Sequence, residues 1–155
     1  MKILLATDLS AASELATDWA FDLARKLRST LLIVSVIDAG EQRLSGPAPF
    51  TQRVDQIRSR REDAAQEVVS RGQRLGIPVE FLVWEGEPGP SIVEAALSEE
   101  ADLVLVGSHG RGALGRLLMG SVSAHVVAHA PCPVLVVRAA RHADGRAVQI
   151  ERHAS

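Results

Sequence analysis

The chain has 155 residues, of which 46% are hydrophobic and 23% charged, and its formal net charge is −2. This length suits one domain with a substantial core. The near-neutral charge excludes a broad basic field for nucleic acid or anionic lipid, and the 3% aromatic content disfavours base-stacking surfaces. We therefore expect no nucleic-acid partner. Because no apolar stretch approaches membrane-spanning length, we also expect no membrane partner.

The cysteine content and the N-terminus predict the compartment. Cys132 is the single cysteine, so an internal disulfide is impossible and a reducing compartment is favoured. The apolar run at residues 3–6 is too short for a secretion signal, and polar Thr7 and Asp8 follow it directly. We expect a cytoplasmic protein.

The first half of the chain alternates strand and helix patterns. Residues 3–6 predict a buried strand, after which Asp8 or Ser10 would cap a helix. Residues 30–36 are apolar and β-branched, which is typical of a strand buried on both faces of a parallel sheet. Residues 38–51, rich in glycine and proline, predict a loop. The helix between the strands has an expected buried face at helical spacing: Leu15, Trp19, Leu23 and Leu27, with Ala16, Ala20 and Ala24 beside them.

The second half continues the alternation. Charged residues of its first helix, Arg61 among them, are expected to face solvent. Glu80 marks the next strand as a partly exposed edge, and Ser91 is expected to cap a short helix after a turn at residues 85–90. The remaining expected helices and strands, in chain order, are residues 53–75, 79–84, 92–97, 103–106, 121–130 and 134–137.

This alternation predicts a single α/β domain whose parallel sheet has helices on both faces, with right-handed crossovers. Residues 139–155 predict a polar C-terminal tail. Ligands of such sheets bind beyond the carboxyl ends of the strands, where the strand order reverses. If the first and fourth strands are neighbours, Asp8 and the glycine-rich loop after residue 106 open onto one crevice. Asp8 could there accept hydrogen bonds from a ribose, or act only as a helix cap.

The glycine-rich loop between the fourth strand and the fourth helix is suited to holding a phosphate. Glycines let the backbone approach an anion, and the helix N-terminus supplies N–H groups and a positive dipole end. No Walker A pattern is present. Residues 110–115 match G-x-G-x-x-G, but they follow the wrong strand and lack the acidic residue about 20 positions later. Gly107-Ser108-His109-Gly110, nine residues, and Gly120-Ser121 form the more informative pattern G-x2-G-x9-G-[ST].

With its flanking segments, this pattern resembles the universal stress protein family, in its ATP-binding branch. The similar segments extend over residues 1 to about 138: residues 6–10, 34–38, 86–88, 101–110 and 130–137. The resemblance implies an open five-stranded parallel sheet in the order 3-2-1-4-5, with four helices on both faces, of the adenine nucleotide alpha hydrolase-like type. It also implies a nucleotide-binding domain at residues 1–138, followed by the tail at 139–155.

The resemblance implies ATP as ligand. A bound Mg²⁺ or Mn²⁺ ion would be held mainly through the phosphates. Asp8 would contact the ribose, and the backbone of Val36 would meet adenine between walls formed by Ala6 and Val106. Arg111 and Arg116 could pair with phosphates or face solvent. No catalytic residue and no protein metal site is assigned, because no nucleophile–base pair is evident and His125 and His129 lack the H-E-x-x-H pattern. The implied phosphate-loop residues are Gly107, Gly110, Gly120 and Ser121, with further contacts from Val122 and Ser123.

The strand at residues 134–137 is an uncharged apolar edge, which invites pairing with another strand. The resemblance implies a two-fold homodimer joined through Val134, Leu135, Val136 and Val137. The expected function is a nucleotide-dependent sensor or regulator of the stress response, acting on an unidentified protein partner. The alternatives are a slow ATP hydrolase and a dimeric interaction module that binds no nucleotide.

Overall fold

The computed structural model describes residues 1–38, 50–108 and 120–138. These ranges contain one five-stranded parallel sheet with the order β3-β2-β1-β4-β5, which confirms the predicted topology. β3 lies at one edge, as Glu80 indicated, and β5 lies at the other. The strands are β1 (Lys2–Ala6), β2 (Thr30–Ile37), β3 (Val79–Glu85), β4 (Leu103–Gly107) and β5 (Val134–Val137).

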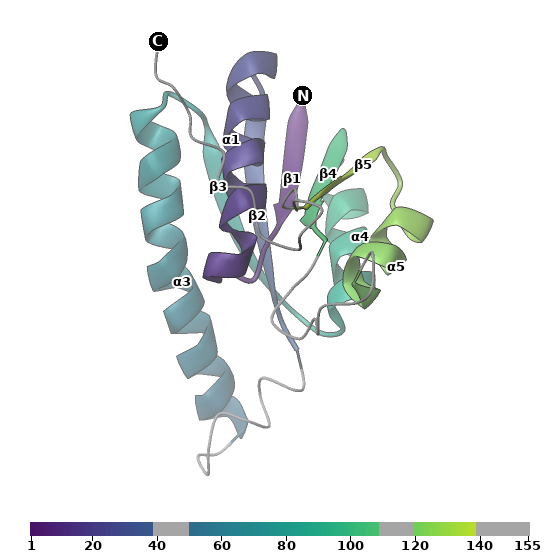
Figure 1. Ribbon diagram of the computed structural model, residues 1–155. Coiled ribbons are helices and arrows are strands. Elements are labelled where there is room, and N and C mark those ends of the chain that lie inside the picture. The colour runs from purple at the N-terminus through teal and green to yellow at the C-terminus, as the bar shows by residue number, and fades with distance from the viewer. Residues whose placement is uncertain (39–49, 109–119, 139–155) are drawn as a thin grey trace, which may run out of the picture.

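The helices form a layer on each face of the sheet, as expected (Figure 1). α1 and α3 cover one face, and α4 and α5 cover the other. None of the helices in the described ranges combines the length and apolarity needed to cross a membrane. The helices are the 3₁₀ turn η1 (Ala11–Ser13), α1 (Glu14–Leu27), α3 (Phe50–Arg74), α4 (Pro88–Ser98) and α5 (Ser121–His129).

The central strands alternate their side chains between two apolar cores. Ile3 and Leu5 of β1 point to the α1 and α3 face, whereas Leu4 points to the α4 and α5 face. All three are fully buried, and each such side chain contributes about 1.5–3 kcal/mol to folding. Burial of both faces explains the nearly continuous apolar runs in these strands.

Helix α1 is rotated relative to the expectation. Its alanines and Phe21 are buried, whereas Trp19 and Leu27 are 44% and 48% exposed, so the expectation was wrong for Trp19 and Leu27. Leu15 and Leu23 pack only against the margin of the core. Small alanine side chains let the helix axis lie close to the sheet, and the larger residues are turned to the side.

Helix α4 begins three residues before the expected cap. Pro88 is its first residue, so the predicted turn at residues 85–90 is too long. Proline suits a first helical position because its φ is already helical and its missing N–H would have no partner there. Ser91 lies inside the helix, with its N–H donating to the Glu87 carbonyl at 3.0 Å, and it is not a cap. α3 likewise begins at Phe50, before the predicted residue 53.

The amino edge of the sheet, where the strands begin, is entered through a repeated backbone turn. A residue with a positive φ follows each of α1, α3 and α4, namely Arg28 (51°), Gly76 (69°) and Glu100 (51°). The next N–H then bonds to a helix carbonyl five residues earlier, as in a Schellman motif. These bonds measure 2.9–3.0 Å and join Ser29 to Ala24, Ile77 to Gly72 and Ala101 to Ala96.

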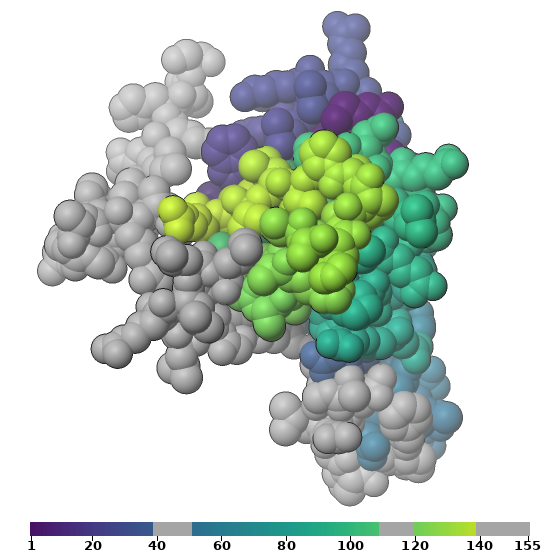
Figure 2. Space-filling model, turned by 90° about the vertical axis from the view of Figure 1, so that its right-hand side faces the viewer, coloured from purple at the N-terminus to yellow at the C-terminus, as the bar shows by residue number. Residues whose placement is uncertain are grey.

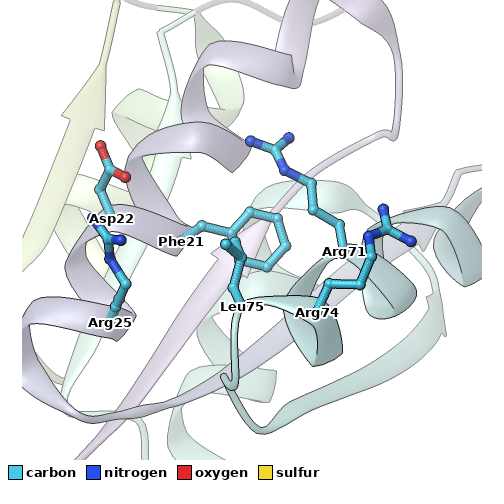
Figure 3. A pocket seen from close by; sticks show the side chains of 6 residues that line it. All are labelled: Phe21, Asp22, Arg25, Arg71, Arg74 and Leu75. Atoms are coloured by element: carbon cyan, nitrogen blue, oxygen red, sulfur yellow. The ribbon is translucent and has the colours of Figure 1, made fainter. Parts of the chain in front are cut away.

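A hollow of about 260 Å³ lies at this amino edge, between the last turns of α1 and α3 (Figure 3). Arg71 pairs with Asp18, and its guanidinium carbon lies 4.9 Å from the ring centroid of Phe21. Arg74 pairs with Glu67. The Asp18 and Glu67 carboxylates offset the charges of Arg71 and Arg74. The hollow lies at the opposite end of the strands from the predicted nucleotide crevice. Its lining residues are Phe21, Asp22, Arg25, Arg71, Arg74 and Leu75.

Candidate functional site

The carboxyl edge of the sheet, where the strands end, brings together the three apolar residues predicted to surround adenine. Ala6 of β1 is in register with Val106 of β4. Both are buried in the core cluster of the α4 and α5 face, and Val36 of β2 packs against the same cluster. Since β1 and β4 are neighbours, the chain segments that follow them leave the sheet side by side.

The segment from Thr7 to Ser13 is cross-linked by its own hydroxyl groups. Thr7 N–H donates to the Val34 carbonyl at 3.0 Å and so extends the pairing of β1 with β2. The Thr7 hydroxyl donates to Ser13 Oγ at 2.8 Å and accepts the Leu9 N–H at 3.0 Å. Ser13 Oγ in turn donates to the Ser10 carbonyl at 2.8 Å. These hydrogen bonds fix the backbone of the loop that carries Asp8.

Asp8 is half-buried and forms a local turn with Ser10. Its Oδ1 accepts the Ser10 N–H at 3.0 Å and the Ser10 hydroxyl at 2.6 Å. Ser10 lies at the N-cap position of η1 and Ser13 at that of α1, but neither makes a side-chain cap bond, so the expected capping by Asp8 or Ser10 is wrong. Leu9, between them, has φ 58°, a left-handed conformation that costs a non-glycine residue about 1–2 kcal/mol. Such strain persists where surrounding contacts over-determine the backbone.

Arg61 of α3 also holds this loop in place, a contact that the sequence did not predict. The expectation of solvent exposure is wrong, because Arg61 is only 5% exposed and one of its guanidinium N–H groups donates to the Asp8 carbonyl. The charge pattern around it gives no sign of this. The spacing of Arg61 does indicate burial, because it lies four residues from both Ile57 and Ala65, which are buried on the same helix face.

The chain between β4 and α5 is closed by a hydrogen bond at its base. Gly107 ends β4, and the next residue, Ser108, accepts the Gly120 N–H on its carbonyl at 2.8 Å. A Cβ on Gly120 would lie 3.2 Å from that carbonyl oxygen, so a side chain there would press on the backbone. Gly120 has φ −70°, which means that space, not conformation, favours glycine. Gly110, Arg111 and Arg116 lie outside the described residues.

The first turn of α5 holds the other residues predicted to bind phosphate. Ser121 is exposed, and Val122 packs against the core cluster beneath the helix. Ser123 is buried, with its hydroxyl donating to the Gly120 carbonyl at 3.0 Å. The first N–H groups of a helix have no partners within the helix and attract anions. The arrangement therefore offers N–H donors next to the closed base of the loop.

Other polar groups of this half of the molecule have structural contacts. The rings of His125 and His129 stack with centroids 4.2 Å apart. Across residues 1–38, 50–108 and 120–138, no three His, Cys, Asp or Glu side chains form a group that could hold a metal ion. Burial, and to a lesser degree the nearby Asp102 carboxylate, raise the pKa of the half-buried Cys132 thiol.

The fold and the site together define a Rossmann-like α/β protein. Its strand order reverses beside β1 and β4, and polar segments follow the carboxyl ends of both strands. Open parallel sheets of this kind bind ligands at that position.

The model of the universal stress protein family matches residues 1–138, and the chain belongs to this family. A universal stress protein of Thermus aquaticus is 38% identical over 138 residues, which cover 88% of this chain and 97% of the relative. The solved structure of UspA from Lactobacillus plantarum superposes with a TM-score of 0.74 at 26% identity, covering 89% of this chain and 97% of that protein.

Two further solved structures contain an adenine nucleotide. A universal stress protein in complex with cAMP has a TM-score of 0.66 at 25% identity, covering 88% of this chain and 95% of that protein. A family member from Arabidopsis thaliana with AMP bound also has a TM-score of 0.66, at 20% identity, and covers 93% of this chain and 94% of that protein. The second likeness is one of fold alone.

Proposed function

We propose that this protein binds an adenine nucleotide at the carboxyl edge of β1 and β4, and that it acts as a nucleotide-dependent sensor or regulator of the stress response in the cytoplasm. The observation that carries the proposal is the register of Ala6 with Val106. It places the Asp8 loop and the base of the glycine loop at the ends of adjacent strands. The solved universal stress protein in complex with cAMP supports the choice of an adenine nucleotide.

Each part of the proposed site suits one part of a nucleotide. Ala6 and Val106 would form apolar walls for the flat base, and the backbone of Val36 would meet it. The Asp8 carboxylate accepts hydrogen bonds from ribose hydroxyls, and charged acceptors make stronger bonds than neutral ones. With ATP, a Mg²⁺ or Mn²⁺ ion would be held mainly through the phosphate oxygens and would neutralise part of their charge. The proposed phosphate contacts are Gly107, Gly110, Gly120 and Ser121, with Val122 and Ser123 at the helix start.

Calorimetry on nucleotide-free protein tests the proposal. ATP and AMP should both bind, and adenosine should bind more weakly because it makes no phosphate contacts. Mass spectrometry of freshly purified, denatured protein should detect a co-purified adenine nucleotide. If the unmodified protein binds none of ATP, AMP and cAMP, the proposal is refuted and an interaction module that binds no nucleotide is favoured.

We also propose that two copies of the chain pair through β5. Among the described residues β5 pairs with β4 alone, and its Leu135 is 36% exposed. Figure 2 shows α5 and β5 together on one face of the molecule. An apolar edge strand of this kind gains backbone hydrogen bonds from a second copy. Val136→Lys should give monomers in light scattering, and an unchanged dimer mass would refute the pairing.

A further inference from the structure

We propose that Arg61 is a positioning residue for the nucleotide site, which holds the peptide between Asp8 and Leu9 so that the Asp8 carboxylate stays at the crevice. The inference rests on the proposed function, because it assigns a cause to the geometry of the residue proposed to bind ribose. Arg61 itself belongs to α3 and contacts the loop through the backbone carbonyl of Asp8.

Both polar atoms of the Asp8–Leu9 peptide are held by side chains. Arg61 donates to the carbonyl oxygen of Asp8, and the Thr7 hydroxyl accepts the N–H of Leu9 at 3.0 Å. A rotation of this peptide plane would break both bonds. Such a rotation is the motion that would relieve the left-handed conformation of Leu9, with its φ of 58°. Arg61 and Thr7 therefore oppose the natural relaxation of the loop.

The burial of Arg61 makes its hydrogen bond to the Asp8 carbonyl important. A buried guanidinium loses its hydration, and hydrogen bonds must offset that loss. Its neighbours on the same helix face, Ile57 and Ala65, are apolar and buried. An apolar residue at position 61 would complete that core face, but it could not donate to the Asp8 carbonyl.

The same helix offers a matched control. Arg58 lies one turn earlier on α3, and it pairs with Glu85 at the end of β3. Its side chain is 37% exposed, and its ion pair joins the helix to β3 and not to the Asp8 loop. Arg58→Met removes one guanidinium from α3, as Arg61→Met does, and leaves the Asp8–Leu9 peptide held.

The test measures ATP and 2′,3′-dideoxy-ATP binding by calorimetry. Arg61→Met should weaken ATP binding about tenfold, the value of a hydrogen bond to a charged group. It should leave 2′,3′-dideoxy-ATP binding nearly unchanged, because that ligand lacks the hydroxyls that Asp8 would contact. Arg58→Met should change neither affinity, Arg61→Lys should recover part of the loss, and Asp8→Ala combined with Arg61→Met should lose no more than Asp8→Ala alone.

Hydrogen exchange separates this inference from the proposed function. Arg61→Met should speed amide exchange at Leu9 and Ser10 in ligand-free protein, and Arg58→Met should not. Equal weakening for both nucleotides, unchanged ATP binding or unchanged exchange would overturn the role of Arg61. If the unmodified protein binds no nucleotide, the proposed function fails, while exchange at Leu9 still decides whether Arg61 fixes the loop.

Discussion

The two edges of the sheet are connected to the helices by different kinds of contact. At the amino edge, three helices pass into strands through backbone-to-backbone bonds that follow Arg28, Gly76 and Glu100. At the carboxyl edge, the segment after β1 is held by side chains, namely the hydroxyls of Thr7 and Ser13 and the guanidinium of Arg61. Backbone turns tolerate many sequences, whereas the segment after β1 depends on particular side chains.

This difference predicts that substitutions at one edge change the stability of the protein and substitutions at the other change its ligand affinity. Substitutions at the amino edge should change the free energy of unfolding and leave ligand affinity intact. Substitutions at the carboxyl edge should change ligand affinity, because they alter the loops proposed to hold the nucleotide. Backbone strain does not distinguish the two edges, since Arg28 and Glu100 at the amino edge have the same left-handed conformation as Leu9.

The largest expected effect on binding comes from Gly120→Val. A Cβ at this position lies 3.2 Å from the Ser108 carbonyl oxygen, and the branched side chain of valine adds further bulk. The variant should open the base of the loop and lower ATP affinity by about a hundredfold or more, which is about 2.7 kcal/mol. Calorimetry measures this loss, and circular dichroism should show an intact fold. Affinity within a factor of two of the unmodified protein would contradict the assignment of the loop.

At the amino edge, Gly72→Ala should strongly reduce stability. A Cβ on Gly72 would lie 2.2 Å from Val79 Cγ2 and 3.1 Å from Phe21 Cε1, so α3 would be forced away from β3 and α1. Overpacking of this kind costs about 1–3 kcal/mol, and we expect the upper part of that range. Urea denaturation measures the change, with the exposed neighbour Gln73→Ala as control. A loss of ATP affinity in the folded variant would argue against the separation of the two edges.

Thr7→Val should lower both the free energy of unfolding and the affinity for ATP. The substitution keeps the shape of the side chain but removes the hydroxyl shared by Leu9 N–H and Ser13. We expect a loss of about 1–2 kcal/mol in the free energy of unfolding and a weaker affinity for ATP. Thr30→Val, at the start of β2, is the matched control. Unchanged binding by Thr7→Val would show that the hydroxyl network does not position Asp8.

Glu100→Gly should stabilise the protein by about 0.5–1 kcal/mol, because glycine adopts the left-handed conformation without strain. Glu100 has φ 51° and is exposed after α4. Thermal denaturation should show a higher midpoint, and ATP affinity should not change. A lower midpoint would show that Glu100 makes a contribution other than through its backbone.

The smallest effect concerns Cys132, whose thiol has a raised pKa in the folded protein because of burial and the nearby Asp102. The unfolded chain therefore ionises this thiol at lower pH than the folded protein does. Its contribution to stability is complete below the ordinary thiol pKa and declines as the pH rises towards the folded value. Cys132→Ala should remove this part of the alkaline slope in urea denaturation, and an unchanged slope would contradict the shift.

The fold was predictable because strand–helix alternation fixes a parallel sheet, and the family resemblance supplied its order. The rotation of α1 was not predictable, because periodicity identifies an apolar face but does not say whether alanines or leucines approach the sheet more closely. The family resemblance named Ala6, Val36 and Val106 as adenine contacts, and the structure puts all three at one core cluster of the sheet, whereas their role toward a nucleotide stays a prediction. The burial of Arg61 was missed because it depends on a contact between α3 and a loop 53 positions away.

An NMR titration of nucleotide-free, ¹⁵N-labelled protein with ATP tests the central claim most directly. We expect amide shift changes at Ala6, Asp8 and Val36, and around Gly120 and Ser121, with little change at the hollow beside Phe21 and Arg71. Saturable changes confined to that hollow at the amino edge, or no saturable changes at all, would contradict the assignment of the carboxyl edge as the nucleotide site.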